Sequence, residues 1–184
     1  LLWLLFLRNA LDGTTSFALF LDNEFFLGPV LSSMSESLRA GEWPLRMDTA
    51  VGGFPLYNFT QLTAFYPLYL TLLPIYESLP EVIINMHRVT LMHLLIMEIN
   101  TYVLLRVIGV SRLGALTGTA LGVFSANSMN YAVWVNIIAP YAWLPLFVAG
   151  IAGMMLRGPC ARYSMMCVVG IVMLTFASPA QPLI

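Results

Sequence analysis

The stretch "VIINMHRVTLMHLLIMEINTYVLLRV", residues 82–107, is long and mostly apolar, and it decides the fold class of the chain. An α-helix needs about 20 predominantly apolar residues to cross the ~30 Å hydrocarbon core of a bilayer, and this stretch exceeds that length. Three further apolar runs follow it: Leu113 to Ser128, Ile137 to Leu156 and Tyr163 to Ala177. We therefore expect about four transmembrane helices in residues 82–184.

The composition of the chain also indicates a membrane protein. Of its 184 residues 59% are hydrophobic and only 9% are charged, and the mean hydropathy is +0.83. A soluble domain carries about 25% charged residues, and a chain of this length cannot build a core that buries so much apolar surface. We predict an all-α, polytopic transmembrane helical bundle whose partner is the lipid bilayer. No basic patch is present, so we expect no nucleic-acid partner.

The beginning of the chain resembles the end of a helix that starts earlier. The opening apolar run, Leu1 to Leu7, is too short to span a bilayer. We expect residues 1–11 to be the end of a truncated first helix and residues 12–81 to form a long extracytoplasmic loop. Residues 1–184 would then be a single transmembrane domain, and a fragment of a longer protein.

Charge is distributed unevenly and predicts the topology. Eight of the nine acidic residues lie before residue 82, whereas the short loops after residue 105 carry only arginine, at Arg106, Arg112, Arg157 and Arg162. Two helices separate these loops, so both lie on one side of the membrane. Short loops rich in Lys and Arg stay in the cytoplasm, and residues 12–81 are therefore expected outside.

The outer loop contains two segments that we expect at the membrane surface. In "PVLSSMSESLRAG", residues 29–41, apolar residues recur at helical spacing, with Gly41 as a stop signal, which predicts an amphipathic helix in the interface plane. "QLTAFYPLYLTLLPIY", residues 61–76, has two prolines and is short for a span, which favours an interfacial or re-entrant segment. Its aromatic residues, with Tyr57, would form a belt at headgroup level: Tyr57, Phe65, Tyr66, Tyr69 and Tyr76. Trp134 and Trp143 are likewise expected to anchor the chain at the interface.

Two carboxylates follow the first apolar run closely. In "FLDNEFFLGP" Asp22 and Glu24 stand between large apolar side chains. Poor solvation raises the pKa of a carboxylate, and such groups can act as bases or hold a cation. Both can face one substrate only where the backbone is not regular helix. The alternative is that these acids simply mark the water boundary.

The succession of motifs resembles the GT-C superfamily of polytopic glycosyltransferases, and within it the YfhO-like bacterial membrane proteins. The motifs are the acidic element at Asp22, Gly41-Glu42-Trp43-Pro44, Gly52-Gly53-Phe54-Pro55 and Phe65-Tyr66-Pro67-Leu68. The segments "HLLIMEINTYVLLRVIGVSRLGALTGTALGVFSANS", "YAWLPLFVAGI" and "SPAQPLI" continue the match over nearly the whole chain.

The resemblance implies a multi-pass enzyme of the bacterial inner (plasma) membrane. Such an enzyme moves a sugar from a polyprenyl-phosphate-linked donor to an extracytoplasmic acceptor, which can be a cell-envelope polymer, a lipid or a protein. Asp22 would be the base or a ligand of a divalent metal (Mg or Mn), and Glu24 would be second in either role. Many relatives lack the second carboxylate.

Further residues are candidates for substrate binding. Arg88 would hold the donor phosphate beside His87, unless it only reaches to the interface. Tyr66 and Asp48 are the other candidates. Glu98 lies within a predicted span, where a carboxylate is either functional or hydrogen-bonded for structure. His93 is expected to pack and hydrogen-bond. A non-catalytic transporter, flippase or assembly subunit that uses Glu98 is the alternative function.

Overall fold

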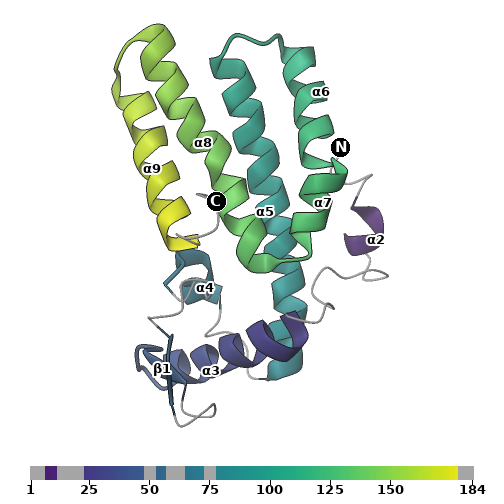
Figure 1. Ribbon diagram of the computed structural model, residues 1–184, viewed down its shortest axis with the longest axis vertical. Coiled ribbons are helices and arrows are strands. Elements are labelled where there is room, and N and C mark those ends of the chain that lie inside the picture. Colours follow the sequence, from purple (N-terminus) through teal and green to yellow (C-terminus); the bar gives the residue numbers. More distant parts are fainter. Residues whose placement is uncertain (1–6, 12–22, 48–52, 57–64, 73–77, 178–184) are drawn as a thin grey trace.

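The computed structural model describes residues 7–11, 23–47, 53–56, 65–72 and 78–177, and this part is mostly helical (Figure 1). Two short elements come first, α2 (Arg8–Leu11) and the π-helix η1 (Asn23–Leu27), and η1 continues into α3 (Gly28–Arg39). The strands β1 (Arg46–Met47) and β2 (Phe54–Pro55) and the helix α4 (Pro67–Leu72) follow. The remaining helices are α5 (Leu79–Val107), α6 (Arg112–Val123), α7 (Ala126–Ala132), α8 (Val135–Arg157) and α9 (Ala161–Ala177).

Two of the described helices are long and apolar enough to cross a membrane. They are α5, with 29 residues, and α8, with 23 residues. At 1.5 Å per residue their lengths are about 43 Å and 34 Å, against ~30 Å of hydrocarbon. The apolar helix α9 is shorter, with 17 residues. The helical class is confirmed, and the long apolar helices α5 and α8 lie where the sequence predicted spans at 82–107 and 137–156.

The run from Leu113 to Ser128, expected as one span, is divided into two helices. α6 ends at Val123 and α7 begins at Ala126. Ser125 causes the break, because its side chain accepts the Ser128 N–H at 3.3 Å and starts a new helix. With 12 residues, α6 is about 18 Å long, too short to cross the hydrocarbon core alone. α7 itself covers Ala126–Ala132, so much of the segment between the predicted runs is helical as well.

The four predicted cytoplasmic arginines lie at one end of the bundle. α5 and α8 both end there, and α6 and α9 both begin there (Figure 1). Arg157 joins two of these ends, because its Nη2 donates to the carbonyl of Val107 at 3.0 Å. Both arginine-bearing loops therefore lie at the same end of the bundle, as predicted, although three helices, α6, α7 and α8, connect them instead of two.

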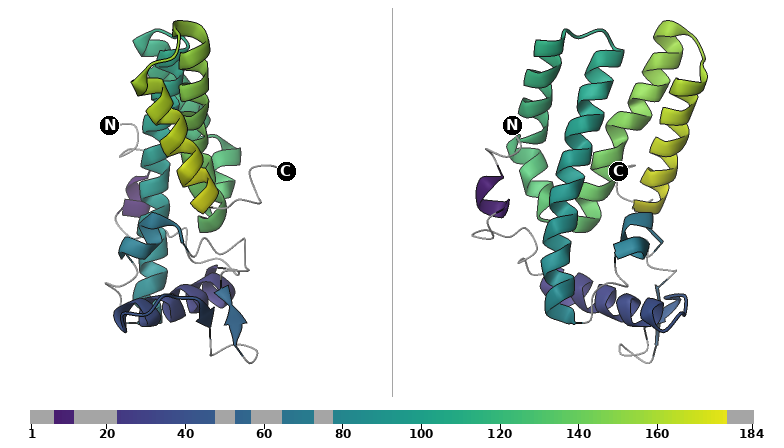
Figure 2. Two further views of the ribbon diagram at one scale, coloured as in Figure 1. Left: turned by 90° about the vertical axis from the view of Figure 1, so that its left-hand side faces the viewer. Right: turned by 180° about the vertical axis from the view of Figure 1, so that it is seen from behind.

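The helix α3 lies across the opposite end (Figures 1 and 2). The predicted apolar face exists: Val30, Leu31 and Met34 are buried, and they pack with Val82 and Met86 of α5. Protein covers this face, because α5 and the loop residues Met47 and Leu56 pack against it. The amphipathic pattern predicted the helix correctly, but it did not predict which part of the protein covers the apolar face.

The chain turns sharply after α3 at Gly41, as predicted. Gly41 has φ 77, a conformation that side chains disfavour. The Gly41 N–H donates to the carbonyl oxygen of Leu38 at 3.1 Å, and the Glu42 N–H donates to the carbonyl oxygen of Ser37 at 2.9 Å. These two hydrogen bonds form a Schellman C-cap. The antiparallel strands β1 and β2 follow. We call α3, β1, β2 and α4 the cap.

The hairpin of α8 and α9 packs closely because glycines line the contact. A Cβ on Gly150 would lie 2.6 Å from the backbone nitrogen of Cys167, and one on Gly170 would lie 2.7 Å from the Cα of Phe147. Small residues let helix backbones approach each other where lipid supplies no hydrophobic driving force between helices. These glycines fix the position of α9 against α8.

Candidate functional site

Tyr66 fastens the cap to the bundle. It directly precedes Pro67, the first residue of α4, and its side chain is fully buried. Proline suits the first turn of a helix and keeps the preceding residue out of the helical conformation, which directs Tyr66 away from α4. The Tyr66 hydroxyl lies 2.7 Å from Nε2 of His93 on α5 and 2.6 Å from Nε1 of Trp143 on α8.

The hydrogen bonds of this cluster have a definite direction. Nδ1 of His93 lies 2.7 Å from the carbonyl oxygen of Val89, which can only accept, so Nδ1 carries a proton. In a neutral imidazole Nε2 then accepts, and the donor is the Tyr66 hydroxyl. The Trp143 indole N–H in turn donates to the Tyr66 oxygen. The chain Trp143, Tyr66, His93, Val89 is therefore satisfied at every step.

The environment of Tyr66 keeps its hydroxyl protonated. Burial raises the pKa of Tyr66 well above its usual range, and the hydrogen bond from Trp143 opposes this shift only in part. A buried, protonated phenol that makes both of its hydrogen bonds within the protein has a structural role, because a substrate cannot reach it. His93 matches its predicted packing role, since it is fully buried and hydrogen-bonded.

The predicted aromatic belt is wrong for Tyr66 and Tyr69. Tyr66 and Tyr69 are both buried, and their rings meet edge to face with centroids 5.5 Å apart. Trp143, which was expected to anchor the interface, donates its indole N–H within the protein. These residues join the cap to α5 and α8, so they are not free to sit among headgroups. Tyr57 and Tyr76 lie outside the described residues.

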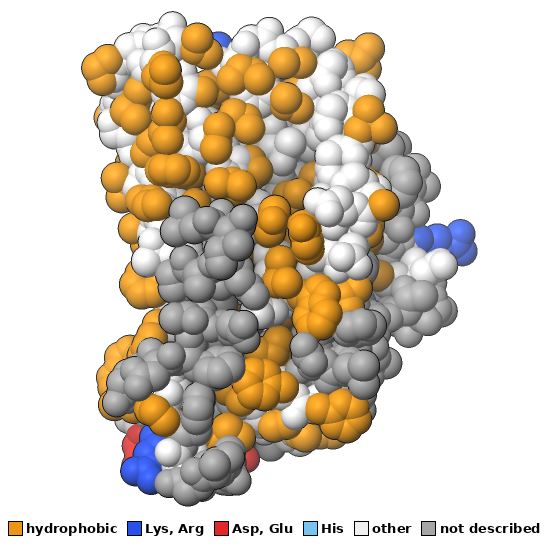
Figure 3. Space-filling view, in the orientation of Figure 1, with side chains coloured by type: hydrophobic (Ala, Val, Ile, Leu, Met, Phe, Trp, Pro, Cys, Tyr) orange, Lys and Arg blue, Asp and Glu red, His pale blue; other side chains and the backbone are white. Residues whose placement is uncertain are grey.

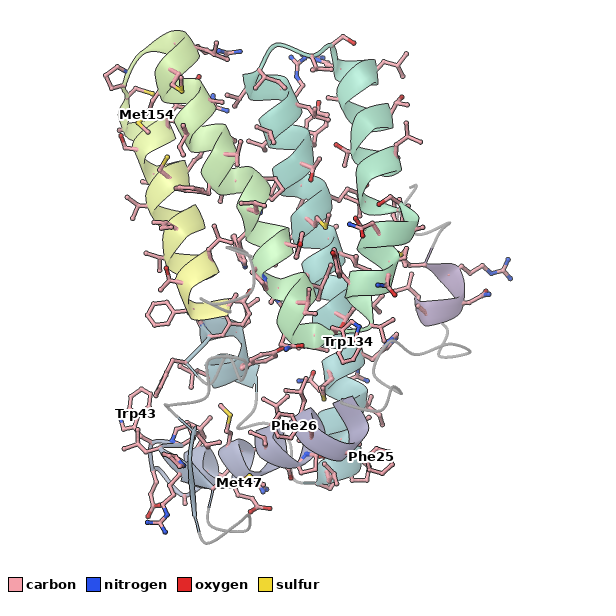
Figure 4. The ribbon with its side chains drawn as sticks, viewed as in Figure 1. Phe25, Phe26, Trp43, Met47, Trp134 and Met154 are labelled. Atoms are coloured by element: carbon pink, nitrogen blue, oxygen red, sulfur yellow. The ribbon has the colours of Figure 1, made fainter. Side chains whose placement is uncertain are left out.

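The predicted carboxylates lie largely outside the described residues. This applies to Asp22, to Asp48 and to the side chain of Glu24. The backbone from Asn23 to Leu27 forms the π-helix η1, so it is not a regular α-helix. π-Helical turns are rare in proteins, and those that do occur are often found at functional sites. The neighbouring Phe25 and Phe26 are exposed beside the first turns of α3 (Figure 4).

Arg88 and His87 differ in their availability. Nε2 of His87 lies 2.8 Å from the carbonyl of Ala10, to which it donates, and this bond joins α2 to α5. Arg88 is exposed, and no hydrogen bond or ion pair joins it to another described residue. Of this predicted pair, Arg88 is therefore the residue that can meet an anion such as a phosphate.

An open cavity of about 190 Å³ lies at the end of α3 and is lined by Leu38, Gly41, Glu42 and Trp43. The Trp43 side chain is 66% exposed at the outer edge of the cap, far from the arginine end (Figure 4). An aromatic face beside a carboxylate can hold a polar ring through stacking and hydrogen bonds. The sequence marked this place through its Gly-Glu-Trp-Pro motif.

The described residues contain no group of three or more His, Cys, Asp or Glu side chains that could hold a metal ion. The carboxylates predicted to bind Mg or Mn, Asp22 and Glu24, lie outside that search.

The space-filling view shows apolar side chains over most of the upper bundle and charged side chains at the foot, beside the cap (Figure 3).

Glu98 lies on α5, away from the cap. It is half-buried, and no described residue hydrogen-bonds or ion-pairs with it. The amide side chains of Asn127 and Asn130 on α7 are exposed. The nearby Asn100 is satisfied, because its Nδ2 donates to the carbonyl of Ala142 at 2.8 Å.

The sequence did not reveal that Tyr66, His93 and Trp143 meet. Each was singled out for a separate role, and no local spacing links residues so far apart in the chain. The one available signal was a histidine within an apolar run, where a buried imidazole needs partners. Comparisons of the chain with protein-family models, with curated proteins and with solved structures found no match.

Proposed function

We propose that this protein is a membrane glycosyltransferase that moves a sugar from a polyprenyl-phosphate donor to an extracytoplasmic acceptor. The observation that carries the proposal is the cap, which Tyr66 fastens across the end of the bundle opposite the four arginines. An ordered cap at the outer membrane surface is suited to enclose a lipid-linked headgroup. The motif resemblance to the GT-C superfamily and to YfhO-like proteins supports the same function.

The proposed placement is a multi-pass protein of the bacterial inner membrane with α5 crossing between Arg88 and Arg106. These arginines are 18 residues apart, about 27 Å along a helix, which matches the ~30 Å hydrocarbon core. Residues 79–87 then extend beyond the hydrocarbon, where α3 packs on them. Arg88 stands at the depth of the donor phosphate.

The proposed reaction needs a base and a cation. The base, Asp22 with Glu24 as second candidate, takes the proton of the acceptor hydroxyl as its oxygen attacks the anomeric carbon. The bond from that carbon to the phosphate oxygen breaks, and polyprenyl phosphate leaves with the electron pair. The Arg88 guanidinium stabilises the leaving phosphate. Mg²⁺ or Mn²⁺ held by Asp22 and Glu24 would supply further positive charge there.

The remaining residues are assigned to positioning. Tyr66 holds the cap through His93 and Trp143, and His87 holds α2. Glu42 and Trp43, in the open cavity, and Asp48, in the same loop, are assigned to the acceptor side. The assignment predicts that Arg88 affects donor binding, whereas Tyr66 affects the stability of the cap.

The test follows transfer of label from radiolabelled polyprenyl-phosphate sugars in membranes that contain the protein at equal, measured amounts. Asp22→Asn should abolish transfer, Arg88→Gln should raise the KM for the donor, and Glu36→Gln on the exposed face of α3 should change neither. If Asp22→Asn transfers label as fast as the parent protein, Asp22 is not the base. If no donor supports transfer by the parent protein, the proposed function fails.

Transport or assembly is the second candidate, and the unpartnered carboxylate of Glu98 favours it. A polar group without a partner at membrane depth is typical of a pathway or of a contact between subunits. Flux or assembly that depends on Glu98 and is indifferent to Asp22 would favour this candidate over transfer.

A further inference from the structure

One face of α5 carries a stripe of exposed residues from Ile84 to Ile99. Ile84, Arg88, Leu95 and Ile99 are exposed on it. Their spacing of four, seven and four residues places them on one face of the helix. The half-buried Glu98 lies at the edge of the same face. The other faces of α5 pack on the cap, on α8 and on α6 and α7.

Glu98 stands near the middle of the membrane. It is ten residues from Arg88 and eight from Arg106, which corresponds to about 15 Å and 12 Å along the helix. If the two arginines mark the boundaries of a ~30 Å core, the carboxyl group lies close to the midplane. A side chain of this length is too short to reach water from there.

A carboxyl group at this depth needs a partner. Charged residues at the centre of a transmembrane helix are strongly disfavoured and almost always face protein or a wet cavity. Glu98 has no such partner among the described residues. Its partly exposed position beside the apolar residues Leu95 and Ile99 therefore indicates that protein, and not lipid, covers this face.

The chemistry of the stripe selects the kind of partner. A second copy related by a two-fold axis along the membrane normal would place residues of equal depth together. Glu98 would then meet Glu98, and Arg88 would meet Arg88, so like groups would oppose each other. A helix with a hydrogen-bond donor at mid-depth satisfies Glu98 without this conflict.

We propose that the stripe of α5 around Glu98 binds a further transmembrane helix that carries Asn, Gln or Arg at the depth of Glu98. The proposal rests on α5 crossing the membrane and not on the proposed glycosyl transfer. It assigns Glu98 to helix recognition. The apolar residues Leu95 and Ile99 supply the packing, and Glu98 supplies the acceptor that selects one helix over another.

The test uses the protein in lipid vesicles with a fluorophore on the exposed Cys160 in a Cys167→Ala background. The probes are acceptor-labelled poly-leucine transmembrane helices that carry a central Asn, no Asn, or an Asn two turns from the centre. We expect energy transfer to show that the central-Asn helix binds about three- to twenty-fold more tightly than the all-leucine helix, the effect of one interhelical hydrogen bond in lipid.

Variants identify the surface. Glu98→Leu should remove the preference for Asn, and Glu98→Gln should keep it, because an amide still offers an acceptor. Ile99→Trp should block binding through bulk, whereas Val168→Trp should not; Ile99 is 54% and Val168 59% exposed. The proposal is overturned if the central-Asn helix shows no advantage, or if the advantage survives in Glu98→Leu.

Discussion

Tyr66 and His93, 27 residues apart in sequence, meet in a buried hydrogen bond of 2.7 Å. The bond joins a segment that follows an outer loop to the middle of the longest helix. Trp143 extends the same contact to α8. These hydrogen bonds hold the Tyr66 segment, α5 and α8 in one arrangement, and this arrangement determines the position of the cap.

Replacing Tyr66 by phenylalanine should destabilise the protein. The change leaves the Nε2 of His93 and the indole N–H of Trp143 buried without partners, which costs about 1–3 kcal/mol for each unsatisfied group. Chemical unfolding of the purified protein in detergent measures the loss. Tyr102→Phe is the control, because the Tyr102 hydroxyl bonds to no described residue; equal stability of both variants would contradict the prediction.

The raised pKa of Tyr66 predicts a loss of stability in alkali. The folded protein holds the phenol proton more tightly than the unfolded chain, whose tyrosines titrate near 10. Above pH 10 unfolding releases this proton, so stability falls by up to about 1.4 kcal/mol per pH unit; below pH 10 the contribution is constant. The measurement is the pH dependence of unfolding from 8 to 11.5. The Tyr66→Phe variant should show a shallower decline than the parent protein, and identical slopes would refute the assignment.

A side chain at Gly150 should push α9 away from α8. Its Cβ would lie 2.6 Å from backbone of Cys167, and overpacking of this kind costs typically 1–3 kcal/mol. We expect Gly150→Ala to lower the thermal midpoint in detergent. Gly122→Ala is the matched control, because nothing lies within 4 Å of its added Cβ; there alanine should be neutral or stabilising through helix propensity.

The arginine end and the cap should be reached by reagents from opposite sides of the membrane. Cys160 is exposed in the turn between α8 and α9, beside the arginines that favour the cytoplasm. A membrane-impermeant maleimide should label it only in inside-out vesicles. Trp43→Cys in a Cys160→Ser background should be labelled only in right-side-out vesicles. Labelling of both positions from one side would reject the proposed topology.

Periodicity and charge predicted much of the fold. The pattern of Val30, Leu31 and Met34 gave the helix α3, and Gly41 gave its end. The arginines correctly predicted which helix ends lie together, because the charge of a short loop can be read directly from the sequence. The break at Ser125 was missed, since a serine within an apolar run is tolerated in a membrane helix and only its cap geometry shows the interruption.

The site was harder to predict because its contacts join distant segments. Tyr66 was predicted to lie in the aromatic belt at the membrane interface, because it belongs to an apolar, aromatic segment. The structure buries it under the cap that it holds in place. His93 was predicted as a packing residue from its apolar surroundings, but its partners were not. The assignments of Asp22, Glu24 and Asp48 remain predictions, since the side chains lie outside the described residues.

In the proposed placement, the separation of Arg88 and Arg106 along α5 makes the protein sensitive to bilayer thickness. A membrane with longer acyl chains would draw one of these guanidinium groups toward hydrocarbon, and the helix would respond by standing more upright or by thinning the lipid around it. The cap is packed on the extension of α5 beyond Arg88, so it would sink toward the headgroups in thick membranes and rise from them in thin ones. The lipid composition of the host membrane would thus set how closely the cap approaches the lipid headgroups.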